Sequence, residues 1–388
     1  MKELSNNPTF RAERLAWRAA GMAAFLCIFC FSGSIAQAQS IPTASGTVFV
    51  KTALGGTIFG YDIDQNGTEG LLSEALLEPS GKLNIATEAF DQTTGKIVKI
   101  VDEQTNTVNN FVTFGIYGNS VGLFEVEQVK GLFVDQRLYG TINPLSSNKV
   151  TGTWTPPLTT DQLIIGLAPS QGSPNTAVLA SNNNFGAMLF ESNIAANTFG
   201  PMITLASGVF GLANSPAPAI DTLTNQVVVA GGSGAFLTHP TLAVVDLTTQ
   251  NVTQFEGLGF GFVNGIAVDS ADGIAVTATE DDFSLEYYNL ATHTGFKVKL
   301  LNASDQSQSG GYVAFDPINK LFLVGQEFSS VAPTGSSILV YDTQGNFVEA
   351  VNGLSLPASP VNIAINPSKR IGFVIVTPDL TELQSFSY

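Results

Sequence analysis

The chain has 388 residues and a formal net charge of −16, and its composition is 44% hydrophobic but only 12% charged. The charged fraction is about half that of an average soluble domain, whereas the apolar content is too high for a disordered chain. Few charges among many small polar residues are typical of an exported protein rich in β-strands. The acidic balance argues against nucleic acid or an anionic membrane surface as a partner.

Residues 1–38 have the three parts of a secretory signal peptide. The basic region contains Lys2, Arg11, Arg14 and Arg18. An apolar stretch then spans Ala19 to Phe31, and Ala36-Gln37-Ala38 is an A-x-A cleavage site. A membrane anchor is the alternative, but the apolar stretch is shorter than the ~20 residues that a spanning helix needs. We therefore expect a mature chain that begins near Gln39 and is secreted or periplasmic, from a bacterial source.

Removal of this segment limits the chemistry of the mature chain. Both cysteines, Cys27 and Cys30, lie in it, so disulfides, thiolate catalysis and cysteine-ligated metals are excluded after cleavage. The segment also carries four of the 16 basic and two of the 32 acidic residues, which leaves a mature net charge of −18. A chain of this size without disulfides needs one large core or a closed array of repeats.

Four segments of the C-terminal half repeat one pattern: an apolar strand, an Asp or Asn, a short polar turn and a second apolar strand. The turns recur at spacings of 48, 47 and 50 residues and begin with Asp221, Asp269, Asp316 and Asn366. Asp and Asn open turns because their side chains accept hydrogen bonds from the backbone two residues on. Between these turns a second hairpin recurs, with turns that begin at Asp246, Asn289 and Asp342. Four strands per repeat predict an all-β fold, a β-propeller of four-stranded blades.

The N-terminal half follows the pattern less regularly. Gly60 to Asp64 resembles the second hairpin of a repeat, while Leu83 to Ile100 and Ile164 to Ala180 are predicted to be first hairpins. Residues 111–157 contain strand-like runs, Val150 to Trp154 among them, that fit one blade or one and a half. The sequence therefore leaves the number of blades open.

The two ends of the chain are predicted to complete one blade together. Val48 to Val50 and Thr57 to Asp62 lack a full blade of their own, and Leu383 to Tyr388 has the pattern of a strand. We expect residues 39–388 to form a single propeller domain closed by N- and C-terminal strands. Seven blades fit best, with six or eight as alternatives. Thr68 to Leu77 is the one candidate helix.

The segment Asn264 to Val276, NGIAVDSADGIAV, resembles the NHL and YVTN-type repeats of secreted β-propellers. The resemblance is clear over residues 215–388 and general before them. It implies that the loops between the second and third strands of each blade, and the connections between blades, lie on one face around a central channel. We call this the loop face. The resemblance does not imply one function, because such propellers include enzymes, binding modules and scaffolds.

The predicted loop face combines acids and amides without Lys or Arg. Such a set suits Ca²⁺ or a small polycation, and the alternative is that these are solvated side chains of an acidic protein. The ligand-binding candidates are Asp102, Glu103, Asn183, His239, Glu280, Asp281, Glu327 and Asp379. Four successive loops also carry an aromatic residue, either as a binding platform or as a contact between blades. These residues are Phe185, Phe236, Phe283 and Phe328.

Asp62-Ile63-Asp64-Gln65-Asn66-Gly67 is the sharpest local motif. D-x-D-x-[DN]-G begins a calcium loop, in which oxygen ligands face one side and the glycine permits the turn. The closing ligand is missing, because Ser73 occupies the twelfth position. A plain hairpin turn at Asn66-Gly67 is the alternative. Asp62, Asp64 and Asn66 are therefore metal candidates in a stabilising role.

Asn264-Gly265 resembles the Asn-Gly pair that opens a blade in calcium-dependent propeller lactonases, the gluconolactonase and paraoxonase-like group. The resemblance implies that Asn264 is a metal ligand in the channel, with Asn362 at the corresponding point of the last repeat. It is incomplete, since Gly310-Gly311-Tyr312 stands where an acidic ligand is needed. An Asn that bonds the backbone at the start of a strand is the alternative.

The sequence thus predicts an exported, non-catalytic binding or interaction module that uses an acidic loop face dotted with aromatic residues. Its partner would be a small molecule, a glycan or a protein, and we expect no nucleic acid, no transmembrane segment after the signal, and a monomer. The alternative is a calcium-dependent hydrolase of lactones or esters with its metal in the central channel. A purely structural surface protein would differ from the first interpretation only in lacking a defined ligand.

Overall fold

The computed structural model describes the chain from residue 47 onward, and its elements there are β-strands. The residues after 47 that are not described are 66, 81–82, 107–108, 118–120, 131–132, 143–155, 160–161, 163, 170–174, 182–186, 194–195, 206–217, 232–238, 262, 280–283, 301–309, 327–335, 355–361 and 377–379. For 99–142 the strands are described but not their side chains. No helix in the described part has the length and hydropathy of a membrane span.

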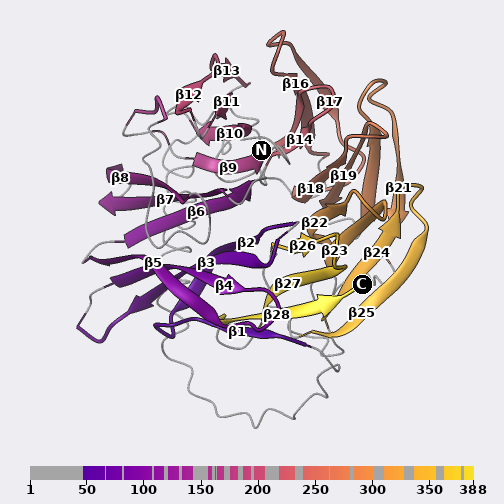
Figure 1. Ribbon diagram of the computed structural model, residues 1–388. Coiled ribbons are helices and arrows are strands. Elements are labelled where there is room, and N and C mark those ends of the chain that lie inside the picture. Colours follow the sequence, from indigo (N-terminus) through magenta and orange to yellow (C-terminus); the bar gives the residue numbers. More distant parts are fainter. Residues whose placement is uncertain are drawn as a thin grey trace, which may run out of the picture. The chain divides into compact units, whose positions relative to one another are not determined.

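The described strands form seven antiparallel sheets, six with a path of four strands and one with three (Figure 1). The first blade contains β2 (Thr57–Ile63), β3 (Glu69–Leu77), β4 (Leu83–Asp91) and β5 (Ile97–Asn106). The three-stranded sheet contains β6 (Asn109–Tyr117), β7 (Val121–Lys130) and β8 (Phe133–Ile142). The next blade contains β9 (Ile164–Pro169), β10 (Asn175–Ser181), β11 (Ala187–Asn193) and two short strands at its edge, β12 (Thr198–Phe199) and β13 (Ile203–Thr204).

Three regular blades follow. The first contains β14 (Ala219–Asp221), β15 (Gln226–Gly231), β16 (Thr241–Asp246) and β17 (Val252–Glu256). The second contains β18 (Val263–Asp269), β19 (Ile274–Thr279), β20 (Ser284–Asn289) and β21 (Gly295–Lys299). The third contains β22 (Gly310–Asp316), β23 (Leu321–Gln326), β24 (Ser336–Asp342) and β25 (Phe347–Leu354).

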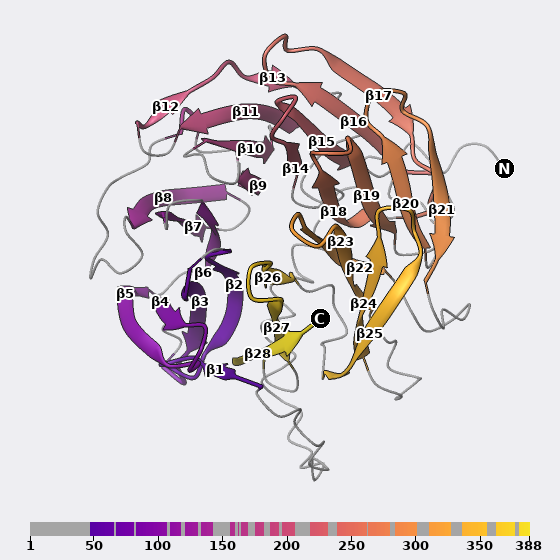
Figure 2. The same ribbon diagram turned by 45° about the vertical axis from the view of Figure 1, so that its right-hand side comes forward.

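The last blade combines strands from both ends of the described chain. It contains β26 (Ala364–Asn366), β27 (Ile371–Val376), β28 (Glu382–Ser387) and, outermost, β1 (Phe49–Lys51). Phe49 lies opposite Gln384 in the register, and Figure 2 shows β1 in indigo beside β28 in yellow. Backbone hydrogen bonds between β1 and β28 therefore join the two ends of the described chain.

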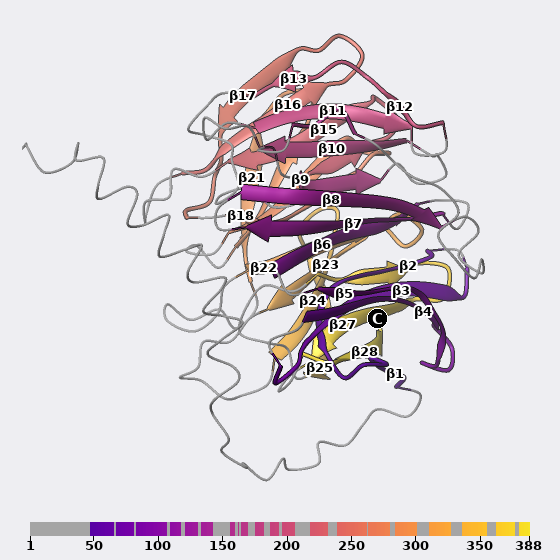
Figure 3. The same ribbon diagram turned by 90° about the vertical axis from the view of Figure 1, so that its left-hand side faces the viewer.

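The first strands of successive sheets contact one another in the order β2, β6, β9, β14, β18, β22 and β26, and β26 contacts β2 again. These innermost strands make the sheets a closed ring (Figure 2), as in a β-propeller. The all-β propeller is confirmed, but the expected number of four-stranded blades is corrected to six. The remaining sheet, β6–β8, lies between β2–β5 and β9–β12 (Figure 3) and has only three strands. Val150 to Trp154, predicted as a strand, lies outside the described residues.

Four predictions for the N-terminal half were wrong, three of them for one reason. Only β1 belongs to the last blade, whereas Thr57 to Asp62 lies in β2 of the first blade, which therefore begins one strand later than predicted. Gly60 to Asp64 ends the innermost strand β2 instead of forming a second hairpin, and Leu83 to Ile100 forms the outer hairpin β4–β5. Thr68 to Leu77 is strand β3, not a helix, because it pairs with β2 on one side and β4 on the other. Ile164 to Ala180 is a first hairpin, as predicted.

Three of the four residues that open the first turn of a repeat, Asp269, Asp316 and Asn366, also join neighbouring blades. Asp316 Oδ1 accepts hydrogen bonds from the N–H groups of its own turn, including Ile318 N at 2.8 Å, which confirms the turn prediction. Its other oxygen accepts a bond from Tyr388 Oη of the next blade at 3.0 Å. Lys320 Nζ likewise donates to Asp269 Oδ1 of the preceding blade at 2.7 Å. Each of the four turn residues, Asp221, Asp269, Asp316 and Asn366, is at most 1% exposed.

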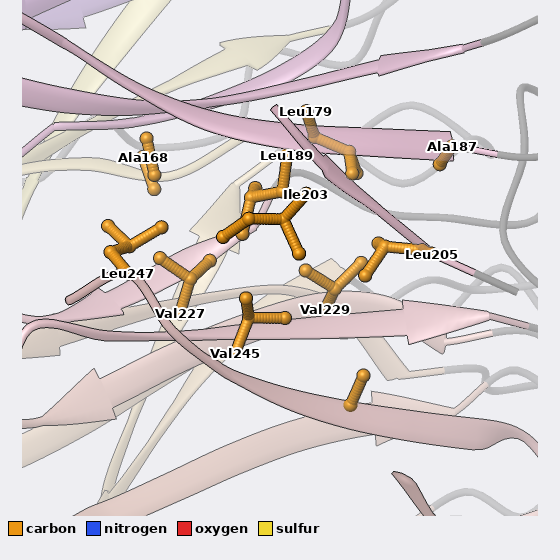
Figure 4. Close-up of a cluster of buried hydrophobic side chains, with 12 residues drawn as sticks. Ala168, Leu179, Ala187, Leu189, Ile203, Leu205, Val227, Val229, Val245 and Leu247 are labelled. Atoms are coloured by element: carbon orange, nitrogen blue, oxygen red, sulfur yellow. The ribbon is translucent and has the colours of Figure 1, made fainter. Parts of the chain in front are cut away.

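Apolar side chains fill the space between adjacent blades. Figure 4 shows one such cluster, in which Leu179, Leu189 and Ile203 face Val227 and Val245 of the next blade. Alternating side chains of a strand point to opposite faces, so the buried strands of a blade supply apolar groups to both neighbours. The blades are thus held together by side-chain packing, and the loops are left to carry other roles.

Candidate functional site

His239 lies at the end of the loop between β15 and β16, and its side chain is 35% exposed. Its Nδ1 lies 2.8 Å from Gly259 O, so Nδ1 carries the proton of the neutral ring and donates to that carbonyl. Gly259 belongs to the connection between β17 and β18, which is anchored where Leu258 N donates to Tyr288 Oη at 2.8 Å. His239 is therefore held at the loop face, where blade β14–β17 meets blade β18–β21.

An aromatic ring, a cation and a carboxylate surround His239. The ring of Phe260 lies 4.4 Å from that of His239 between centroids, and Lys297 Nζ lies 5.3 Å from the centroid of Phe260. Glu256 Oε1 is 3.6 Å from His239 Nε2. Phe260 is partly exposed and Lys297 is exposed. We call these four residues, His239, Glu256, Phe260 and Lys297, the His239–Phe260 cluster.

A buried carboxylate, that of Glu286, packs against the backbone connection that carries Phe260. Glu286 on β20 is 0% exposed, and its oxygens accept hydrogen bonds from three hydroxyl groups. These are Thr277 Oγ1 at 2.7 Å, Thr279 Oγ1 at 2.8 Å and Ser284 Oγ at 2.6 Å. A buried carboxylate is tolerated only when its oxygens are hydrogen-bonded. Glu286 thus fixes the end of the β19–β20 hairpin beneath the connection that carries Phe260.

Gly259 packs so closely on this carboxylate that a Cβ atom there would lie 2.6 Å from Glu286 Oε1 and would also meet the side chain of Thr279. We expect Gly259→Ala to lower the free energy of unfolding by about 1–3 kcal/mol, because overpacking forces buried groups to shift. Gly200→Ala is the matched control, since its Cβ would have its nearest neighbour at 3.6 Å. Urea unfolding of both variants measures the difference, and equal losses would contradict the close packing at Gly259.

The predicted acids of the loop face are only partly placed. Asp102 and Glu103 were predicted on the loop face, but they lie within strand β5, opposite Thr87 and Ala86. The other candidates lie outside the described residues, and their convergence stays a prediction. They are Asn183, Glu280, Asp281, Glu327 and Asp379, together with Phe185, Phe236, Phe283 and Phe328.

The predicted calcium loop forms the turn between β2 and β3. Asp64 N donates to Glu69 O at 2.9 Å, and Asp64 Oδ1 accepts a bond from Gly67 N at 3.0 Å. Asp62 Oδ1 accepts a bond from Ile63 N at 2.8 Å. Both carboxylates therefore bond the local backbone, as in the hairpin alternative, and Asn66 lies outside the described residues. Within the described part, no group of three or more His, Cys, Asp or Glu residues is placed to hold a metal ion.

Asn264, the other metal candidate, lies on the innermost strand β18 at a β-bulge, where Val263 pairs with Thr279 and Gly265 with Ala278. Bulges re-aim side chains and are common at the rims of closed sheets. Gly265 itself has a packing role, because a Cβ there would lie 2.5 Å from Val313 N of β22. The Asn-Gly pair is thus explained in part by the close approach of two inner strands.

Asn362 behaves as the backbone-bonding alternative predicts. Its Nδ2 donates to Tyr61 O at 3.2 Å, and the Tyr61 hydroxyl donates to Asn362 O. The two bonds link the start of the last blade to the first. Burial raises the pKa of the Tyr61 phenol well above its usual value, so the phenol stays a hydrogen-bond donor.

Sequence reasoning missed three of the residues that build this site. Phe260, Lys297 and Glu286 were not among the predicted site residues. Glu286 did leave a signal, since it interrupts the apolar run of its strand at a position that the other blades fill with Ala243 or Leu339. A single charge in a buried strand needs a partner, and that requirement could have directed attention to this end of the blade.

The fold and this cluster define a β-propeller with an aromatic and basic patch on its loop face. No protein-family model and no curated protein match the chain in sequence, so the expected NHL or YVTN identity is not supported by a family match. The structure is similar to one described as "Structure of U3-55K", with a TM-score of 0.63 and 12% identity, covering 89% of this chain and 100% of that one. It is also similar to one described as "Structure of Dos1 propeller", with a TM-score of 0.55 and 10% identity, covering 88% and 82%. At such identities the similarity shows the propeller fold alone.

Proposed function

We propose that this chain is an exported, non-catalytic β-propeller that binds a partner through its loop face. The observation that carries the proposal is the His239–Phe260 cluster, in which a partly exposed ring contacts both an imidazole and an ammonium group. Large aromatic and cationic side chains supply most of the binding energy at interfaces. The partner would be a protein, glycan or small molecule with an apolar face and hydrogen-bonding groups at its edge.

The packing beneath the cluster favours binding over a loose surface contact. His239 is tied to Gly259 O, and Gly259 rests on the buried Glu286. Side chains fixed before binding lose less conformational entropy when a partner arrives, which improves affinity. The signal-peptide pattern of residues 1–38 supports export, and the net negative charge of the chain would favour a partner with basic or neutral groups.

Phe260→Ala tests the proposal, with Phe347→Ala as the matched control, because Phe347 is 41% exposed on the outer strand β25. A photoreactive residue placed at 260 or at 347 probes protein partners on the producing cell, and gel retardation in defined neutral and acidic polysaccharides probes glycans. We expect crosslinks to the partner from position 260 and none from position 347. We also expect Phe260→Ala to bind the partner about tenfold more weakly than the wild-type protein, the usual scale for an interface anchor.

The competing hydrolase makes the opposite prediction for the same proteins. Lactone and ester hydrolysis that requires Ca²⁺, is lost in Asn264→Ala and survives in Phe260→Ala would overturn the binding proposal. Absence of any contact specific to position 260, in both the crosslinking and the polysaccharide measurements, would overturn it as well.

A further inference from the structure

Two buried glutamates lie beneath the segment that joins the last blade to the first. Glu74 on β3 and Glu88 on β4 are both 0% exposed. Glu74 is opposite Ala86 and Glu88 is opposite Leu72 in the register, so the two acids are diagonal neighbours on one face of the sheet. Acids in this position need hydrogen bonds, and the joining segment supplies them.

The joining segment consists of residues 52–56, which we call the clasp segment. Its Leu54 N and Gly56 N donate to the two oxygens of Glu74, each at 2.6 Å. Its Ala53 N lies 3.1 Å from both oxygens of Glu88. Three of the backbone N–H groups in residues 53–56 are therefore bonded to this pair of side chains, and these bonds attach the segment to the first blade.

The clasp segment lies between the last blade and the first, so its bonds to the two glutamates also help to join these blades. It follows β1, which pairs with β28 in the last blade, and it precedes β2, the innermost strand of the first. Thr52 N also donates to Thr381 O at 3.2 Å, and Ile58 N donates to Leu380 O at 2.8 Å. The clasp segment thus spans the place where the ring closes.

A single proton shared by the two acids makes this arrangement stable. Both oxygens of Glu74 accept short bonds from N–H groups of the clasp segment. Glu88 is hydrogen-bonded to Glu74, and burial together with the neighbouring Glu74 raises the pKa of Glu88 to about 8. Glu88 therefore keeps its proton and donates it to Glu74, since two buried carboxylates in contact cannot both ionise at low cost.

Among the side chains that the structure describes, no cation is placed against the pair. The clasp segment has no titratable side chain, and β2 places Ile58 opposite Glu74. Outer strand β5 places Asp102 and Glu103 opposite Thr87 and Ala86. The nearest described cation along the chain, Lys51, precedes the clasp segment and is paired with Glu382 at 2.7 Å on the surface.

We propose that Glu74 and Glu88 form a proton-dependent clasp, which holds the clasp segment down when they share a proton and releases it when that proton is lost. The closed pair binds the proton more tightly than the same side chains do in an opened, hydrated state. Closure is therefore most stable below the ordinary pKa of a glutamate, about 4.5. It weakens as the pH rises towards about 8, the pKa of Glu88 in the closed pair, and is constant above that value.

Hydrogen exchange of the full mature chain tests the clasp between pH 5 and 9. Protection factors, corrected for the intrinsic exchange rate at each pH, are measured for peptides covering 50–58, with β19–β20 as an internal reference for global stability. We expect protection of the clasp segment to fall by up to about tenfold per pH unit and to level off near pH 8, because opening is coupled to the loss of one proton. The reference strands should not follow this profile.

Glu88→Gln removes the titrating proton but keeps a neutral donor towards Glu74, so its clasp segment should show the same protection at every pH. Glu382→Gln breaks only the surface pair with Lys51 and should keep the wild-type slope. A flat wild-type profile would overturn the clasp whatever the variants do, and so would a wild-type slope that persists in Glu88→Gln.

Discussion

Replacing Phe373 with Ala is expected to lower the free energy of unfolding by about 3–5 kcal/mol, the usual cost of removing a buried phenyl ring. Phe373 on β27 is 0% exposed and meets Phe90 of β4 edge to face, with centroids 5.5 Å apart. The two rings belong to the last and the first blade. The first and last blades are linked at their inner strands and through the clasp segment. They therefore cannot move together to close the cavity that this variant would leave. Urea unfolding followed by circular dichroism measures the loss.

Phe296→Ala is the matched control for this result. Phe296 stacks on Tyr287 at a centroid distance of 4.9 Å, but it is 47% exposed on the outer strand β21. Removing it leaves no cavity, so we expect a loss of about 1 kcal/mol or less. Similar losses in the two variants would show that the closure does not depend on the packing between Phe90 and Phe373.

Replacing Asn366 with Ala is expected to lower the free energy of unfolding by about 3 kcal/mol, which is the second large effect. The Asn366 side chain is 0% exposed, and its Nδ2 donates to Gly67 O at 3.1 Å and to Gln92 Oε1 at 2.9 Å, both in the first blade. Its Oδ1 accepts a bond from Ser368 Oγ at 2.7 Å in its own turn. Alanine would leave several buried polar groups without partners, each at a cost of about 1–3 kcal/mol. Thermal and urea unfolding both report the loss.

Asn289→Ala is the matched control, because it removes an asparagine that opens a turn without removing a hydrogen bond between blades. Asn289 opens the turn after β20 in the same way, accepting a bond from Thr292 N at 2.9 Å, but it is exposed and bonds no neighbouring blade. We expect a loss of about 1 kcal/mol there. Asn366→Asp should in turn be less stable at pH 7 than at pH 4, since an ionised carboxylate would face carbonyl oxygens. Equal losses for the two alanine variants would mean that Asn366 acts only within its turn.

The candidate site illustrates which parts of a site can be predicted from a sequence. His239 was predicted, because a histidine in a loop without other basic residues is conspicuous. Its partners were not, since Phe260 follows in the next connection and Lys297 lies on an outer strand two hairpins later. Only the folded blade places Lys297 5.3 Å from the centre of the Phe260 ring. The glutamates of the clasp were missed for a similar reason, because the donors that make them stable belong to a distant backbone segment.

The repeat, the four-stranded blade and the turn residues were determined by the sequence alone. A turn is built from residues within a few positions of one another, so the oxygen of Asp316 reaches its N–H partners whatever the rest of the chain does. Alternating apolar residues likewise define a strand without knowledge of its neighbours. These features are local, and a regular spacing was enough to predict them.

That the two ends of the chain share a blade was predicted, but the number of four-stranded blades and the strands that each end contributes were decided only by the tertiary structure. Val48 bonds Ser385, which is 337 positions away, and nothing in either local sequence specifies that pairing. Because β1 alone belongs to the last blade, the strands β2 to β5 take different places from those that their patterns suggested. Long-range pairing depends on which edges and faces are left unsatisfied after the local elements form, and that is settled only when all the blades pack together.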